Sequence, residues 1–260
     1  MRFSGSWRTR TVLHDILTVF LKEWNEYLHA RGSKRGTIFI VFFPVLIFGI
    51  FMPLQAGREW VESPLPLVMF GWVPLLFVSA MIADSFAGER ERHTLETLLV
   101  SRLSDSVILL GKYCAGISYG VLVTGLIVFT GLLTVNITQW NGSIVMYPLK
   151  WTLSGTAACV ISSCLIAGIG VLVSLKAPTV RQAHQMMSFG IIAIAFLPSI
   201  LVKLFFGRLS EGTRLWLKST VNSLDPVSIG IAVAVVFLVL DAAVLFAAMK
   251  RFKRARMILD

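Results

Sequence analysis

The sequence predicts an all-α protein that crosses a membrane several times. Of its 260 residues, 56% are hydrophobic and only 15% are charged, whereas about a quarter of the residues in a soluble domain are charged. The apolar residues also gather in runs that approach or exceed the roughly 20 residues a helix needs to cross a bilayer. These two observations exclude an ordinary soluble domain and indicate a polytopic membrane protein.

Six apolar runs predict six transmembrane helices within a transmembrane domain at residues 37–249. The runs are Thr37–Leu54, Pro64–Ala83, Val107–Val135, Thr152–Leu175, Met187–Phe206 and Val227–Met249. Pro44, Pro74 and Pro198 lie inside three of these runs and predict kinks there, because a proline removes one backbone hydrogen bond.

The distribution of positive charge predicts the orientation. Six spans place both termini on one side, and eighteen of the 24 Lys and Arg residues fall on that side, against six on the other. Because Lys and Arg concentrate in cytoplasmic loops, we expect both termini in the cytoplasm. The net charge of +10 therefore reflects topology, and we expect no nucleic-acid partner. The basic tail at 250–260 also suits contact with anionic membrane lipid.

Two further segments suit the membrane surface. Within the N-terminal segment 1–36, apolar residues from Val12 to Leu28 recur at helical spacing, with charged residues on the opposite side. This pattern predicts an amphipathic helix that lies in the headgroup layer or binds a partner protein. The apolar content of 207–226 predicts one or two short helices in the outer interface.

The loop at 84–106 carries a distinctive pattern. Leu95, Leu98 and Leu99 share one helical face, and the alternating charges of Glu89–Arg92 come directly before them. Such a helix suits docking into a groove on another protein, but a solvated connector resting on the membrane fits the pattern equally well.

The same loop carries a family resemblance. The strings Gly88–Glu91, Thr94–Leu99 and Leu109–Lys112 together resemble the signature of ABC-2 type transporter permeases, including the sodium-extrusion-like branch. Thr179–Gln185 is similar to a second stretch of that signature. The family often has a proline and a basic residue where this chain has Arg102 and Asp105.

The resemblance implies a role in ATP-driven export. In such permeases the loop after the second span forms a coupling helix, which sits in a cleft of a separate ATPase subunit. The contacts that carry over are Glu89, Arg90, Glu91, Thr94, Leu95 and Glu96, with Arg181 and Gln185 as a second set. Two ATPase copies and a second permease chain, identical or homologous, are expected in a prokaryotic plasma membrane.

The chain itself lacks the motif for ATP hydrolysis. A P-loop requires GxxxxGK[ST], and the nearest string here has Ser106 in place of the first glycine and Tyr113 in place of the hydroxyl residue. We therefore expect ATP and Mg²⁺ on the partner subunit, and no catalytic residue, cofactor or metal in this chain.

One acidic residue lies deep in the last predicted span. An ionised Asp241 there would cost about 2.5–3.5 kcal/mol on insertion scales, so it should face protein or water, or carry a proton. It is either a contact on a transport pathway or an interhelical hydrogen-bonding group. An ATP-independent ion channel or secondary carrier remains the alternative function, and the sequence does not indicate the substrate.

Overall fold

A computed structural model describes residues 5–29, 42–63, 65–208, 210–213 and 226–252. The all-α prediction is confirmed for this part of the chain, which contains helices and no strand. The elements are α1 (Gly5–His29), the π-helical segment η1 (Val45–Phe51), α3 (Met52–Ala56), α4 (Glu59–Glu62), α5 (Leu65–Glu91), α6 (Leu95–Val100), α7 (Asp105–Thr138), α8 (Leu149–Lys176), α9 (Val180–Arg208) and α11 (Pro226–Arg251).

Four of the described helices are long and apolar enough to cross a membrane. They are Met69–Glu91, Asp105–Thr138, Leu149–Lys176 and Gly230–Arg251. These coincide with the second, third, fourth and sixth predicted spans. The fifth predicted span lies within α9, which is not among the four. Six spans therefore remain a prediction.

The first predicted span is a shorter apolar helix at Phe42–Ala56, and residues 37–41 lie outside the described part. Pro44 precedes the π-helical turns of η1, and Gly57 ends α3 with a φ of 61°. A glycine adopts this left-handed conformation at little steric cost, so the helix stops there and the short α4 follows.

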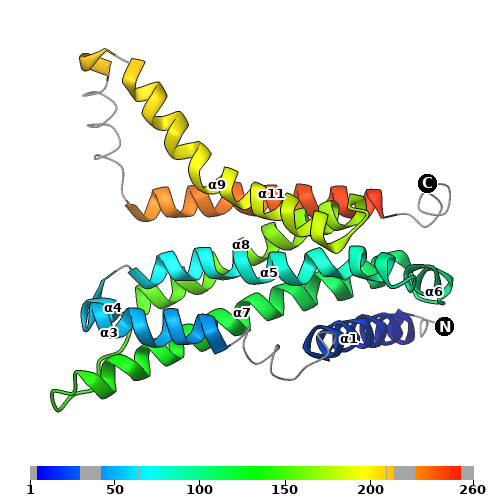
Figure 1. The fold of residues 1–260 in the computed structure, drawn as a ribbon, viewed down its shortest axis with the longest axis horizontal. Helices are drawn as coiled ribbons and strands as arrows, with labels where there is room; N and C mark the ends of the chain where they lie inside the picture. The colour runs from blue at the N-terminus through cyan, green and yellow to red at the C-terminus, as the bar shows by residue number, and fades with distance from the viewer. Residues whose placement is uncertain (1–4, 30–41, 64, 209, 214–225, 253–260) are drawn as a thin grey trace.

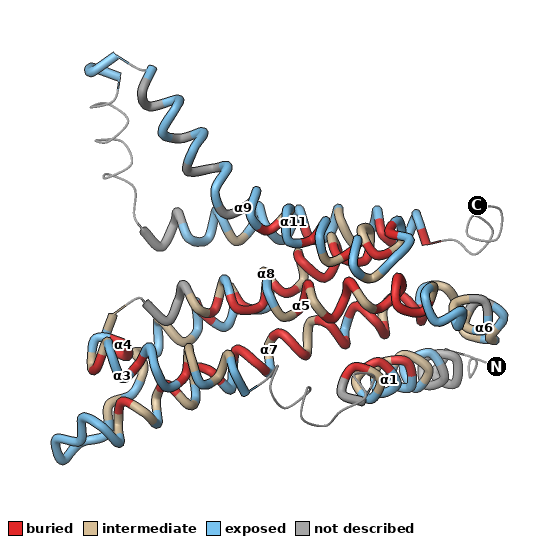
Figure 2. The backbone as a smooth tube through the Cα atoms, in the orientation of Figure 1, coloured by how far each residue is buried: buried red, intermediate tan, exposed pale blue. Residues whose placement is uncertain are grey.

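Helices α5, α7 and α8 form the centre of the bundle (Figure 1). The side chain of Ile82 on α5 packs against Gly116 of α7 and Gly170 of α8. A Cβ atom at either glycine would lie only 2.5–2.6 Å from this side chain. The glycines at these positions let the three backbones approach closely, as in other membrane helix pairs. The burial map shows the same region as the most continuous buried stretch (Figure 2).

The remaining helices surround this centre unevenly. The first half of α9 runs beside α8, and its second half diverges from the bundle, while α11 is mostly exposed (Figures 1 and 2). Helices α1 and α6 and the last turns of α11 lie at one end, and α3 and α4 lie at the other. Most of the predicted outer segment, residues 209 and 214–225, and the tail at 253–260 lie outside the described residues.

Candidate functional site

The loop after α5 turns sharply before it forms α6. Helix α5 continues to Glu91, and His93 then adopts a positive φ of 57°, a conformation in which histidine is enriched. The backbone nitrogen of Thr94 donates to the carbonyl of Glu89 at 2.9 Å, which closes the turn. Ser104 accepts from the backbone of Val107 and caps α7. Helix α6 therefore occupies only part of the predicted loop at 84–106.

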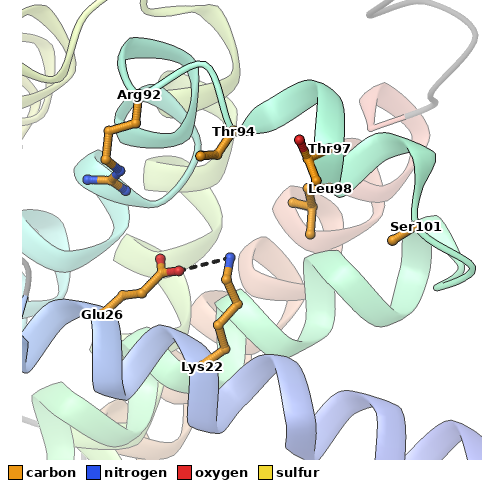
Figure 3. Close-up of a pocket in the computed structure, with 7 residues that line it drawn as sticks. All are labelled: Lys22, Glu26, Arg92, Thr94, Thr97, Leu98 and Ser101. Atoms are coloured by element: carbon orange, nitrogen blue, oxygen red, sulfur yellow. Dashed lines mark ion pairs between the residues drawn. The ribbon is translucent and has the colours of Figure 1, made fainter.

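A groove separates α6 from α1, and we call it the α1–α6 groove. Its volume is about 660 Å³. Figure 3 shows Lys22 and Glu26 on α1 facing the opposite wall, which is built by the α5–α6 turn and α6. The lining residues are Lys22, Glu26, Arg92, Thr94, Thr97, Leu98 and Ser101. The groove therefore has Lys22 and Glu26 on the α1 side, and Arg92 together with threonine, leucine and serine side chains on the opposite side.

A buried ion network continues from the groove into the protein. The ammonium of Lys112 on α7 lies 2.7 Å from Glu23 Oε1 on α1 and 3.0 Å from Glu89 Oε1 on α5. The side chains of Lys112, Glu89 and Glu23 are only 0%, 2% and 8% exposed. Lys112 also donates to the carbonyl of Ser85 at 2.9 Å and lies above the ring of Phe86. One ammonium thus joins three helices.

Lys22 links this network to the groove. Its ammonium lies 2.9 Å from Glu89 Oε1, 3.2 Å from Glu26 and 3.8 Å from Glu23, and its side chain is 41% exposed. Burial lowers the pKa of Lys22, but the hydrogen bond to Glu89 and the charges of the three glutamates raise it above 10.5 overall. Lys22 therefore remains a cation at neutral pH.

Glu23 experiences the opposite balance. Burial raises its pKa above the ordinary 4.5, although the charge and hydrogen bond of Lys112 pull in the other direction. The carboxylates of Glu23, Glu26 and Glu89 lie within 4.8 Å of one another, a spacing that could hold a metal ion. The ammonium groups of Lys22 and Lys112 already lie among these carboxylates, so their negative charge is balanced by side chains of this chain.

The structure places the first three predicted partner-contact residues in different surroundings. Glu89 is buried in the ion network, and Arg90 donates to the carbonyls of Ala177 at 2.6 Å and Leu175 at 3.0 Å. Arg90 thereby caps the C-terminal end of α8. Glu91 is exposed and accepts from the backbone nitrogen of Val180 at 3.2 Å.

The other predicted contacts lie nearer the surface. Thr94 is exposed on the groove, and Leu95 is half-buried against the central core. Glu96 belongs to α6, but its side chain is outside the described set. Arg181 and Gln185 are both exposed near the start of α9. The contact of Glu91 with Val180 brings the two predicted loops together.

Asp241 lies on α11 where this helix packs against α8. Its residue is 8% exposed, and neither carboxylate oxygen has a hydrogen-bond partner among the described residues. One turn away, Val244 fills the space in front of Gly168. The burial agrees with an inward-facing position, but an interhelical hydrogen bond is not present within the described part of the chain.

Sequence reasoning did not identify Lys112 and Glu23 as site residues. Lys112 belongs to the family-like string Leu109–Lys112, and Glu23 lies among the charged residues opposite the apolar face of the N-terminal segment. The available signal was a lysine at the start of a long apolar run, since ionisable residues in such runs are rare and have partners. The sequence pattern did not indicate which residue is the partner of Lys112.

Comparison with known proteins identifies the family. The sequence model described as ABC-2 type transporter matches residues 14–204, which include α1 from His14 onward, the groove and the ion network. The chain belongs to the ABC-2 type transporter family. It is therefore an integral membrane protein of the permease type.

One similar protein covers part of this ABC-2 permease. The ABC transporter permease protein NatB of Bacillus subtilis (strain 168) is 28% identical over 138 residues, which is 48% of this chain and 34% of NatB. The chain thus spans about a third of the length of the curated relative it matches.

Proposed function

We propose that this chain is the permease subunit of an ABC exporter and that a separate ATPase docks at the α1–α6 groove. The observation that carries the proposal is the position of the groove. It lies between α1 and α6, and Lys22 joins its lining directly to the buried network of α5 and α7. A protein seated there would contact the groups that connect three helices.

The surface around the groove suits a protein partner. Val100 at the end of α6 is 85% exposed, and Thr94 and Thr97 are also accessible. The exposed Arg181 and Gln185 lie in the first turns of α9, whose first residue Val180 is hydrogen-bonded to Glu91 at the end of α5. In this proposal the partner contacts the exposed residues, and Glu89 and Arg90 hold the loop in position from within.

The predicted orientation supports an ATPase on the side of the groove, whereas the outward direction of transport and the assembly rest on the family resemblance. Positive charge places the groove on the cytoplasmic side, where ATP is available. Two ATPase subunits bind ATP and Mg²⁺, and a second permease chain completes the transporter. Family membership favours this ATP-driven mechanism over the ATP-independent channel or carrier that the sequence left open.

Purification of the complex tests this function. The tagged chain is extracted from its native membrane in a mild detergent, and the recovered proteins are identified by mass spectrometry and assayed for vanadate-sensitive ATP hydrolysis. We expect a P-loop ATPase to co-purify with the parent chain. Recovery of the chain alone, without ATP hydrolysis, would contradict the proposal.

A matched pair of variants locates the docking surface. Thr97→Arg places a long side chain in the groove, and Ser143→Arg places the same side chain on the exposed turn between α7 and α8. We expect Thr97→Arg to lose the ATPase and Ser143→Arg to retain it. Equal recovery with both variants would exclude the groove as the docking surface.

A further inference from the structure

We propose that Lys112 is a positioning residue that holds α1, the end of α5 and the start of α7 together as one rigid unit. A displacement of α6 by a docked ATPase then reaches α1 and α7 together. The transmission of an ATPase-driven displacement depends on the proposed function. The existence of the rigid unit does not depend on it, because the unit is formed by this chain alone.

The three donors of Lys112 are all used. A lysine ammonium has three N–H groups, and Lys112 directs them to Glu23, Glu89 and the carbonyl of Ser85 at 2.7–3.0 Å. Each acceptor comes from a part of the chain distant from Lys112, with Glu23 on α1 and the other two on α5. The ammonium can satisfy these acceptors only while α1 and α5 keep their present separation.

Glu89 depends on the two lysines for charge compensation. Its Oε1 atom lies near both ammoniums, while its Oε2 atom is buried without a partner among the described residues. Removing one member of a buried ion pair leaves the other charge uncompensated, which is far more disruptive than replacing the whole pair by neutral groups. Lys22 is partly exposed, so Lys112 is the buried member that fixes the carboxylate.

Helix α1 is otherwise anchored to α7. Trp24 Nε1 donates to Ser118 Oγ at 2.8 Å, and the rings of Tyr27 and Tyr119 lie 4.9 Å apart. These contacts hold α1 along α7 but do not involve α5. Among the described residues, the lysine–glutamate network therefore supplies polar contacts that join the end of α5 to the α1–α7 pair.

Spin labels on α1 and α6 test the rigid unit. Leu17→Cys and Val100→Cys place labels on exposed positions of the two helices, in a parent in which Cys114, Cys159 and Cys164 are replaced by alanine. The distance distribution is measured by pulsed electron paramagnetic resonance on the permease in lipid nanodiscs. We expect one narrow distribution of distances between the labels in the parent, and a broad distribution in Lys112→Met.

Two further variants separate positioning from folding. Lys150→Met makes the same substitution at an exposed lysine of α8 and should keep the narrow distribution. Glu23→Gln with Lys112→Met removes one uncompensated charge, and we expect it to restore the yield of folded protein but not the narrow distribution. If Lys112→Met does not fold, the distance distribution is measured on this double variant instead.

The outcomes distinguish the two proposals. A narrow distribution in either Lys112→Met or the double variant would overturn the positioning role. Because the permease is measured without an ATPase, this result keeps its meaning even if no ATPase co-purifies. In the assembled transporter, we expect the double variant to retain ATP hydrolysis but to lose a joint ATP-dependent movement of the labelled helices.

Discussion

The ammonium of Lys112 lies 2.7 Å from a carboxylate oxygen of Glu23, although the two residues are 89 positions apart in the chain. Both side chains are nearly completely buried between α7 and α1. This ion pair makes α1 an integral part of the helical bundle. The first prediction therefore concerns the stability of the fold itself.

Lys112→Met should strongly destabilise the folded permease. The variant leaves Glu23 and Glu89 buried with one cation fewer, and loss of one partner from a buried ion pair costs about 3–5 kcal/mol. The free energy of unfolding can be measured by detergent denaturation in mixed micelles. The exposed Lys150→Met should change it by less than about 0.5 kcal/mol. Equal effects of the two substitutions would show that the network contributes no stability.

Glu23→Gln should change how stability depends on pH. Burial raises the pKa of Glu23 above 4.5, so the folded chain binds this proton more tightly than the unfolded chain. The resulting stability is fully present below pH 4.5 and is lost as pH rises through the raised pKa. Glutamine does not titrate, so the thermal stability of the variant should rise relative to that of the parent as pH increases above 4.5. Parallel stability curves would contradict this effect.

Gly111→Ala should weaken the docking of α1 on α7. A Cβ atom at Gly111 would lie 2.6 Å from Cβ of Val19 and 3.2 Å from the backbone oxygen of Ile16, so α1 must move away. Gly125→Ala on the same helix meets no neighbouring atom and should be neutral or stabilising by up to about 1 kcal/mol. Limited proteolysis of α1 in nanodiscs measures the difference. Equal protection of α1 in both variants would argue against close packing at Gly111.

Asp241→Asn should preserve membrane insertion and, if Asp241 is a contact on the transport pathway, abolish transport. The amide keeps the size of the buried side chain and removes the cost of a carboxylate at a helix centre. Expression and thermal stability should therefore equal or exceed those of the parent, while substrate-stimulated ATP hydrolysis by the complex is lost. Normal stimulated hydrolysis would assign Asp241 a structural role.

The sequence was sufficient to predict the long helices. The runs that became α5, α7, α8 and α11 are long and apolar, and the membrane leaves a single chain segment few alternatives to a helix. The first run was predicted to end at Leu54, whereas the described helix continues to Ala56 and ends at Gly57, whose φ is 61°. A count of apolar residues does not contain that information.

The candidate site was only partly predictable. The pattern of α1 indicated two faces but not which one meets the protein. Leu13 and Leu17 are more than half exposed, whereas Val19 and Glu23 are buried. Similarly, the charges of Glu89 and Arg90 resembled a surface patch, yet both side chains bind groups more than 65 positions away. Such partners are set by helix packing, which residue spacing alone does not encode.

Site-specific photocrosslinking tests the central claim most directly. A benzoylphenylalanine residue is introduced at Thr97 in the groove, or at Ser143 on the exposed α7–α8 turn as the control, and native membranes are irradiated. We predict an adduct between position 97 and a P-loop ATPase, with none from position 143. Absence of the adduct at position 97, or equal adducts at both positions, would contradict docking of the ATPase in the α1–α6 groove.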